Sequence, residues 1–121
     1  MSVTIRITKS FKAAVKPLLK KFPSLSSDLL KLEKELLQNP KQGTALGHNV
    51  YKIRLKISSK GKGKSGGARV ISFVETLLIG DVQIMGEEIN VNLITIYDKT
   101  DTANISDKEL KDLIKAFYEN D

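Results

Sequence analysis

Positively charged side chains crowd the middle of the chain, where residues 36–74 contain no carboxylate. The densest part is residues 51–57, in which Lys52, Arg54 and Lys56 alternate with apolar residues. This alternation is typical of a strand with one buried and one exposed face, and it places neighbouring cations about 6.6 Å apart. That spacing is close to the phosphate spacing of a nucleic-acid strand. The pattern therefore predicts a binding site for a polyanion.

More cations follow the predicted strand. Lys60, Lys62 and Lys64 lie in a glycine-rich segment, residues 59–67, which predicts a flexible loop able to close over a phosphate backbone and bind RNA. An ordinary hairpin loop made soluble by lysines is the alternative. Arg69 comes directly after this segment, and its guanidinium can grip a phosphate through two parallel hydrogen bonds, as a lysine cannot.

Residue types that are rare or absent in the chain exclude some kinds of catalysis and metal binding. The chain has no cysteine and a single histidine, His48, which excludes thiolate metal ligation and histidine-pair acid–base catalysis. We expect His48 to be a loop residue. Four acids lack the spacing of a carboxylate metal motif and are expected to be solvated loop acids: Glu87, Glu88, Asp98 and Asp101. We predict no metal and no cofactor, so that lysine, arginine or tyrosine carries any catalysis.

Length and charge distribution set the class of protein. With 121 residues, 40% of them apolar, the chain is expected to form one domain over residues 1–121. No apolar run approaches a membrane span, and we expect a soluble cytoplasmic protein with no membrane partner. Residues 1–74 hold sixteen Lys and Arg against three Asp and Glu, whereas residues 75–121 hold four against eleven. Such segregation favours a polyanionic or acidic partner, with simple solubility as the alternative.

Local patterns predict the elements that position these side chains. A strand is expected over residues 3–7, and a helix over residues 11–22 that Pro17 kinks or divides. A second helix over residues 25–37, with Ser24 as its cap, ends at Asn39-Pro40, and the two helices are expected to pack as an antiparallel hairpin.

The second half of the chain predicts strands and a final helix. Residues 41–49 are expected to be a loop, and strands are expected over residues 51–58, 68–76 and 90–97, with residues 77–89 extending a hairpin. A capping box at Ser106 predicts the last helix. The predicted fold is α+β: an N-terminal strand and helical hairpin packed on an antiparallel sheet of about four strands, with a C-terminal helix.

Several segments resemble the RelE/HigB branch of the RelE/ParE superfamily of toxins from type II toxin–antitoxin systems. The most specific are the Lys-Ile-Arg block at residues 52–54 and the Ser-Gly-Gly-Ala-Arg-Val-Ile block at residues 65–71. The resemblance extends over residues 11–25, 39–43, 46–47, 51–54, 58–71, 94–99 and 104–106. It implies a single RelE-like toxin domain that cleaves mRNA in the ribosomal A site. It also implies inhibition by a cognate antitoxin, and operator DNA binding only through the toxin–antitoxin complex.

The resemblance also implies roles for particular residues. In the family, cations of the basic strand and the arginine of the next strand hold the scissile phosphate, which points to Arg54, Lys56 and Arg69, with Lys52 close by. Family members also use an arginine and a tyrosine nearer the C-terminus. This chain has no arginine after Arg69, and Tyr97 and Lys99 are the residues in the corresponding region.

Without a metal or a histidine pair, the expected chemistry is attack by a ribose 2′-OH on the adjacent phosphate. Arg54 and Arg69 would stabilise the developing charge, and Lys52 or Lys56 would act as base if nearby cations depress its pKa. Tyr97 is expected to stack on a base or to donate a proton. Two alternatives remain open at this stage: a ParE-like poison of DNA gyrase, and a nucleic-acid-binding module without catalysis.

Overall fold

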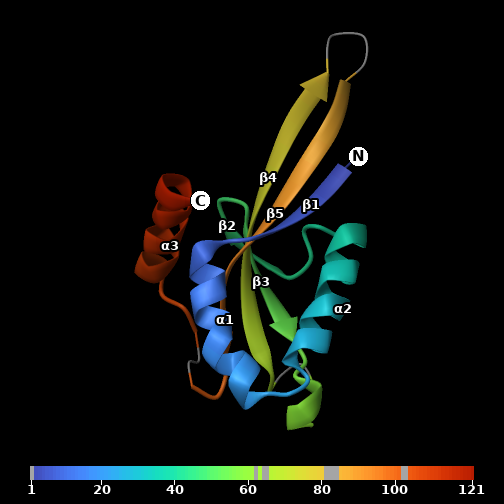
Figure 1. Cartoon of the computed structure of the whole chain (residues 1–121). Helices are drawn as coiled ribbons and strands as arrows, with labels where there is room; N and C mark the ends of the chain where they lie inside the picture. The colour runs from blue at the N-terminus through green and yellow to red at the C-terminus, as the bar shows by residue number, and fades with distance from the viewer. Residues whose placement is uncertain (1, 62, 64–65, 81–84, 102–103) are drawn as a thin grey trace.

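The computed structural model describes the chain except for residues 1, 62, 64–65, 81–84 and 102–103. Lys62 and Lys64, two of the predicted RNA-binding lysines, therefore lie outside the described residues. The elements follow one another as strand β1 (Ser2–Ile7), helices α1 (Lys9–Lys21) and α2 (Leu25–Gln38), strands β2 (Thr44–Gly47) and β3 (Val50–Leu55), the short 3₁₀ helix η1 (Ser58–Lys60), strands β4 (Ala68–Gly80) and β5 (Met85–Asp98), and helix α3 (Asp107–Asn120) (Figure 1).

The α+β fold class is confirmed, with one mixed sheet in the order β1-β5-β4-β3-β2. Strands β3 to β5 form the predicted antiparallel meander, and β2 extends it by one further antiparallel strand. Strand β1 differs, because it pairs parallel to β5, with Ser2 opposite Glu88 and Ile7 opposite Leu93. The two helices after β1 carry the chain from β1 at one edge of the sheet to β2 at the other edge.

The fifth strand arises where a loop was expected. Residues 44–47 form the exposed edge strand β2, so the prediction of a loop across residues 41–49 was wrong there. His48 and Asn49 both have positive φ, 53° and 64°, and connect β2 to β3 as a two-residue turn. Such turns match the twist of a hairpin and favour asparagine. His48 is an exposed turn residue at the other end of β3 from Arg54.

Helices α1 and α2 cover one face of the sheet. Thr8 caps α1 by accepting a hydrogen bond from the Phe11 amide at 3.2 Å. Pro17 lies within α1 without dividing it, because the apolar side of the helix packs on the sheet and offsets the missing backbone hydrogen bond. The break at Phe22-Pro23 and the end of α2 before Asn39 occur as predicted. The core between helices and sheet contains Phe11, Val15, Leu18, Phe22, Leu25, Leu32, Leu36, Ile53, Leu55, Val70, Val91 and Ile96.

Helix α3 packs on the opposite face of the sheet. Ser106 accepts a hydrogen bond from the Glu109 amide at 3.1 Å, which confirms the predicted capping box. The apolar side of α3, formed by Leu110, Leu113, Ile114 and Phe117, meets the side chains of Val50, Ile71, Phe73 and Ile94. Because neighbouring residues of a strand point to opposite faces, β3, β4 and β5 each contribute to both cores.

Strands β4 and β5 form the longest hairpin and extend well beyond the other strands (Figure 1). Its register places Arg69 opposite Tyr97 and Leu77 opposite Glu88. A shift between Ile71 and Ser72 inserts one extra residue in β5. Among the described residues, no helix is long and apolar enough to cross a membrane.

Candidate nucleic-acid interface

Three predicted site residues form a row across the sheet. Arg54 of β3 pairs with Arg69 of β4, and Arg69 pairs with Tyr97 of β5. Directly paired residues point to the same face, and adjacent strands are about 4.8 Å apart, so the three side chains emerge side by side. We call Arg54, Arg69 and Tyr97 the cross-strand row. Lys52 lies two residues before Arg54 on β3 and therefore points to the same face.

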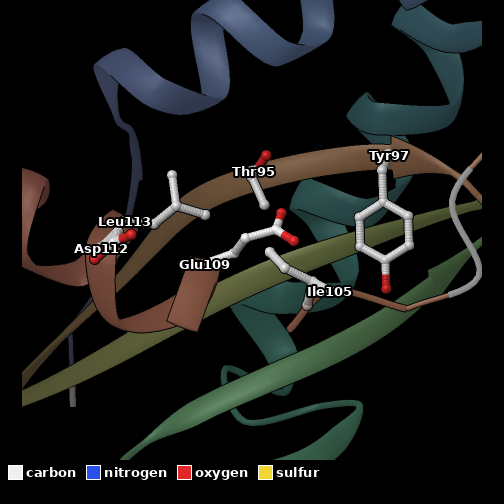
Figure 2. Close-up of a pocket in the computed structure, with 6 residues that line it drawn as sticks. All are labelled: Thr95, Tyr97, Ile105, Glu109, Asp112 and Leu113. Carbon is white, nitrogen blue, oxygen red and sulfur yellow. The ribbon is translucent and has the colours of Figure 1, made fainter. Parts of the chain in front are cut away.

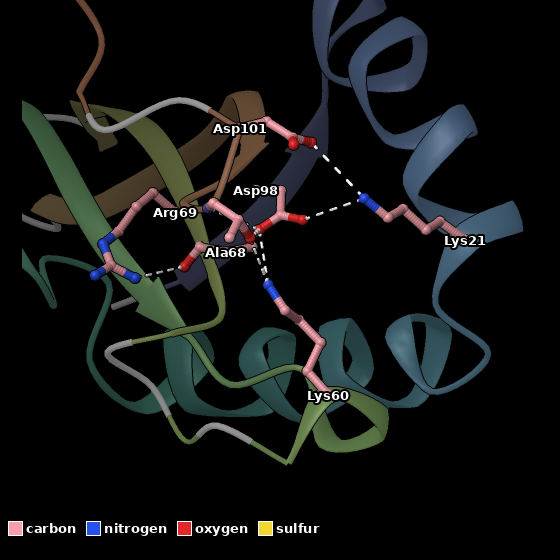
Figure 3. Close-up of polar contacts among 7 residues, drawn as sticks. Lys21, Lys60, Ala68, Arg69, Asp98 and Asp101 are labelled. Carbon is pink, nitrogen blue, oxygen red and sulfur yellow. Dashed lines mark hydrogen bonds and ion pairs between the residues drawn. The ribbon is translucent and has the colours of Figure 1, made fainter.

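The two arginines of the row differ in burial. Arg69 is only 3% exposed, and its Nη1 donates to the backbone carbonyl of Ala68 at 3.1 Å (Figure 3). Burial lowers the pKa of Arg69, the adjacent charge of Arg54 lowers it further, and Tyr97 acts in the opposite direction. Arg54 is exposed, and no carboxylate within the described part of the chain forms a salt bridge with it. The row thus combines a sheltered guanidinium with an accessible one.

Close approach of the backbone sets where β4 begins. A Cβ atom at Gly67 would lie 2.1 Å from the carbonyl oxygen of Leu55, which no side chain tolerates. Glycine therefore lets the chain enter β4 directly against the end of β3. This entry places Ala68 opposite Leu55 and Arg69 opposite Arg54.

Tyr97 ends the row with a buried phenol. Its hydroxyl oxygen is buried and makes no hydrogen bond of ordinary length within the described part of the chain, although the Ile105 backbone lies near enough to affect its pKa. Burial raises the pKa of Tyr97 and the carboxylate of Glu109 adds to this, whereas Arg69 and the backbone of Ile105 oppose it. The phenol therefore stays protonated at neutral pH and can donate a hydrogen bond.

A pocket of about 330 Å³ adjoins Tyr97, between β5 and α3 (Figure 2). Its lining residues are Thr95, Tyr97, Ile105, Glu109, Asp112 and Leu113. Sequence reasoning missed Glu109 and Asp112 as site residues. Their spacing of three along the last helix was a visible signal, because residues three apart lie on one helix face.

The other predicted cations of this region differ in their surroundings. Lys52 is half-buried, and its Nζ lies 3.4 Å from the side-chain oxygen of Asn104. Lys56 is exposed but comes after the end of β3, which is shorter than the predicted strand. Lys99 is exposed in the turn after β5, where its backbone amide donates to Gly67.

Lys60 does not project from a loop. It belongs to η1, its side chain is 11% exposed, and its Nζ lies 2.8 Å from Asp98 Oδ1 and 2.9 Å from the hydroxyl of Thr100 (Figure 3). Its ammonium also lies 5.3 Å from the centre of the Phe22 ring. The structure thus joins Lys60 to an internal carboxylate on the helical-hairpin side of the sheet, away from the cross-strand row.

Asp98 corrects a second expectation. It is 2% exposed, and is therefore not a solvated loop acid, whereas the side chain of Asp101 is 65% exposed as expected. Burial alone would raise the pKa of Asp98, but hydrogen bonds from Lys60 and Thr100 outweigh it and lower the pKa to about 2. Lys21 contributes a longer contact of 3.8 Å to the same carboxylate (Figure 3). Glu87 and Glu88 lie in β5.

A second buried acid, Asp28, binds Ser58, the first residue of η1, while Asp98 binds Lys60, its last residue. Its carboxylate accepts hydrogen bonds from the Ser58 hydroxyl at 2.6 Å and the Ser58 amide at 3.0 Å. Burial opposes the charge of Asp28, yet these bonds and one from Ser24 lower its pKa. Sequence reasoning missed Asp28, although its place between Leu25 and Leu32 on the core side of α2 was a usable signal.

No cluster of three or more potential metal-ligating side chains occurs within the described ranges of the chain. In comparisons with known proteins, no family model matches this chain and no solved structure matches it. Function is therefore inferred from the site itself and from the sequence resemblance.

Proposed function

We propose that this protein is a toxin of a type II toxin–antitoxin system that acts as a ribosome-dependent, metal-independent mRNA endoribonuclease. The observation that carries the proposal is the cross-strand row, in which Arg54, Arg69 and Tyr97 lie side by side with Lys52 on the same face. Two guanidinium groups on adjacent strands fit the non-bridging oxygens of one phosphate. The resemblance to the RelE/HigB branch supports RNA as the substrate.

The proposed reaction is an internal phosphoryl transfer. The ribose 2′-oxygen forms a bond to the adjacent phosphorus, the bond from phosphorus to the 5′-oxygen breaks, and a 2′,3′-cyclic phosphate and a 5′-hydroxyl result. The 2′-hydroxyl loses a proton to a base, and the leaving 5′-oxygen gains one. The substrate supplies the nucleophile, so the protein needs only to position the phosphate, stabilise its added negative charge and move two protons.

The side chains of the site suit these tasks. Arg54 and Arg69 stabilise the negative charge of the phosphorane, and the burial of Arg69 strengthens its electrostatic effect. Tyr97 stays protonated, which suits donation to the leaving oxygen or stacking on a base. Lys52 is the nearest candidate for contact with the 2′-oxygen, because it shares the face of the row, whereas Lys56 lies past the end of the strand.

The partners of the proposal come from the resemblance alone. They are mRNA in the ribosomal A site, the ribosome, and a cognate antitoxin that inhibits the toxin in the cytoplasm. The charge distribution supports an anionic partner, because residues 1–74 hold sixteen Lys and Arg against three Asp and Glu.

Induced expression of the chain in a bacterial host tests the proposal. We expect growth arrest, and 5′-hydroxyl ends of mRNA at fixed codon positions of translated regions. Arg54→Ala and Arg69→Ala should each slow cleavage at least about a hundredfold, as the loss of one preorganised charge donor does. Arg6→Ala is the matched control, because Arg6 is an exposed arginine of β1 outside the row.

Two results would contradict the proposal. One is cleavage at the parental rate by the folded Arg54→Ala variant, whose exposed side chain is not needed for folding. The other is growth arrest with intact mRNA and broken DNA, which is the behaviour of a gyrase poison.

A further inference from the structure

The outer part of the β4–β5 hairpin extends past the rest of the sheet (Figure 1). Strand β3 accompanies β4 only as far as Phe73, and β1 accompanies β5 only from Glu88 onward. Residues 75–80 of β4 pair with residues 85–90 of β5, and we call this part of the hairpin the arm. Within the described residues, the arm has no strand beside β4 on its other edge.

The free edge of β4 carries unpaired backbone groups. The amide of Val74 donates to the carbonyl of Asn49 at 2.9 Å, so the backbone groups of Val74 point toward the side of β3. Backbone groups alternate in direction along a strand, and those of Thr76 and Leu78 therefore point to this side too, beyond the end of the β3 pairing. An unpaired strand edge is a template on which another strand can pair.

The side chains of the arm make its two edges unequal. Leu77 is 46% exposed and Leu78 is 67% exposed, and the two point to opposite faces. Proteins commonly protect an edge strand with a charged residue or a proline, but residues 76–80 contain neither. Strand β5, in contrast, carries Glu87 and Glu88. The β4 edge is therefore the one suited to pairing with another strand.

We propose that the β4 edge of the arm pairs antiparallel with the same edge of a second copy of this chain, about a two-fold axis at Leu77. In this register Thr76 lies opposite the partner's Leu78, so the free backbone groups of both residues are satisfied. An axis at Leu78 would instead place Thr76 opposite the partner's Gly80, and the φ of 103° at Gly80 is not that of a strand.

Charge favours pairing through β4 over pairing through β5. With the two β4 strands in contact, the two β5 strands lie three strand spacings apart, about 14 Å, which exceeds the Debye length of about 8 Å in physiological salt. Pairing through β5 would instead bring Glu87 and Glu88 of the two copies beside one another, and like charges on adjacent strands are destabilising.

The contact is short, so we expect weak association that depends on protein concentration. It leaves the cross-strand row open, because Arg69 lies eight residues before Leu77 on β4, about 27 Å away along the strand. Self-association of the arm is thus independent of the proposed ribonuclease function.

Cysteine cross-linking tests the pairing, because the chain has no cysteine of its own. In Leu77→Cys the two thiols would face each other in a non-hydrogen-bonded pair with Cα atoms about 4.5 Å apart, within the range for a disulfide. Mild oxidation should cross-link this variant at least about tenfold faster than Thr76→Cys, whose two copies would lie diagonally, roughly 7–8 Å apart. Leu30→Cys, at an exposed leucine of α2, measures cross-linking by random collision.

Sedimentation equilibrium tests the contact without a covalent bond. The dimer fraction should rise with protein concentration, and Leu78→Lys should lower the association constant at least about tenfold, because it adds the charge that the edge lacks. Leu30→Lys is the matched control and should leave the association constant unchanged.

Three results would overturn the proposal. One is a protein that stays monomeric at millimolar concentration while Leu77→Cys cross-links no faster than Leu30→Cys. Another is a dimer that Leu78→Lys does not weaken, since its interface would lie elsewhere. The third is faster cross-linking of Thr76→Cys than of Leu77→Cys, which is incompatible with an axis at Leu77.

Discussion

Where the start of β4 pairs with the end of β5, cations on the two faces of the sheet have different surroundings. On the face covered by α1 and α2, Asp98 holds the ammonium of Lys60 at 2.8 Å. On the other face, Arg69 lies between Arg54 and Tyr97. Tyr97 and Asp98 are consecutive residues of β5, so the alternation of a strand alone separates the two environments.

This difference shows that the charge of a lysine or arginine does not by itself make a binding site. Lys60 and Arg54 belong to the same carboxylate-free stretch of sequence. Lys60 is paired inside the protein and links η1 to Asp98 at the end of β5, whereas Arg54 is exposed with no carboxylate of the described chain in salt-bridge contact. The buried ion pair and the exposed cation that we propose to attract an anion thus lie on opposite sides of one sheet.

Removal of the buried carboxylate gives the largest expected effect. Asp98→Ala should lower the free energy of unfolding by about 3–5 kcal/mol, because it leaves the ammonium of Lys60 mostly buried without its partner. Urea denaturation of the variant and the parent, followed by far-UV circular dichroism, measures the difference.

Asp101→Ala is the control for that experiment. The Asp101 carboxylate is exposed and lies 3.9 Å from the exposed ammonium of Lys21, so its loss should change the free energy of unfolding by less than about 0.5 kcal/mol. A decrease in the free energy of unfolding below about 1 kcal/mol for Asp98→Ala would mean that the ion pair between Lys60 and Asp98 does not stabilise the fold. The contrast between the two faces would then be lost.

Acidification probes the same carboxylate without a mutation. The pKa of Asp98 falls from 3.8 to about 2 in the folded protein, so the folded state favours the ionised form. The resulting stabilisation is fully present above pH 3.8 and is lost as the pH falls through about 2, and it amounts to about 2 kcal/mol. Urea denaturation at intervals between pH 5 and pH 2 measures it.

Asp98→Asn supplies the comparison curve, because it has no carboxylate to titrate at this position. Its stability should decline with acid less than that of the parent by about 2 kcal/mol across the same interval. The remaining decline includes Asp28, whose pKa is also lowered in the folded state. Parallel curves for the parent and the variant would contradict the assignment.

Much of the fold was predictable because its signals are local. The apolar stripes of α1 and α2, the proline after Phe22 and the capping box at Ser106 each depend on residues within a few positions of one another. The parallel pairing of β1 with β5 was not predictable in this way. Local alternation identifies a strand, but the choice of its neighbour depends on residues more than eighty positions away, as for Ser2 and Glu88.

The candidate site was likewise predictable where its signals are local and not predictable where they depend on distant residues. Alternation along β3 was enough to place Arg54 on the exposed side of its strand, whereas the burial of Arg69 depends on the tertiary structure, and the direct pairing of Arg69 with Arg54 follows from the hairpin register. The fate of Lys60 depends on Asp98, thirty-eight positions later, and no local pattern indicates that contact. The pocket likewise depends on how α3 docks on the sheet, and this docking brings Glu109 near Tyr97.

The smallest expected effect comes from Tyr97→Phe. This change removes a single oxygen atom and so tests one face of the sheet without altering the other. Tyr97→Phe should slow mRNA cleavage about tenfold, the amount expected when one hydrogen bond to the reacting phosphate is lost. The same change should leave the free energy of unfolding unchanged or raise it by up to about 1 kcal/mol, since the buried hydroxyl has no partner in the described part of the chain. Cleavage kinetics and urea denaturation of one preparation measure both.

Tyr51→Phe is the matched control from the other face. Tyr51 packs against the core beneath α1 and α2, so its hydroxyl is remote from the cross-strand row and its removal should not slow cleavage. Equal loss of cleavage in both variants would indicate a general effect on the sheet instead of a role for the row. A loss confined to Tyr97→Phe, together with undiminished stability, requires the phenol to act on the substrate, because no weakening of the fold accompanies it.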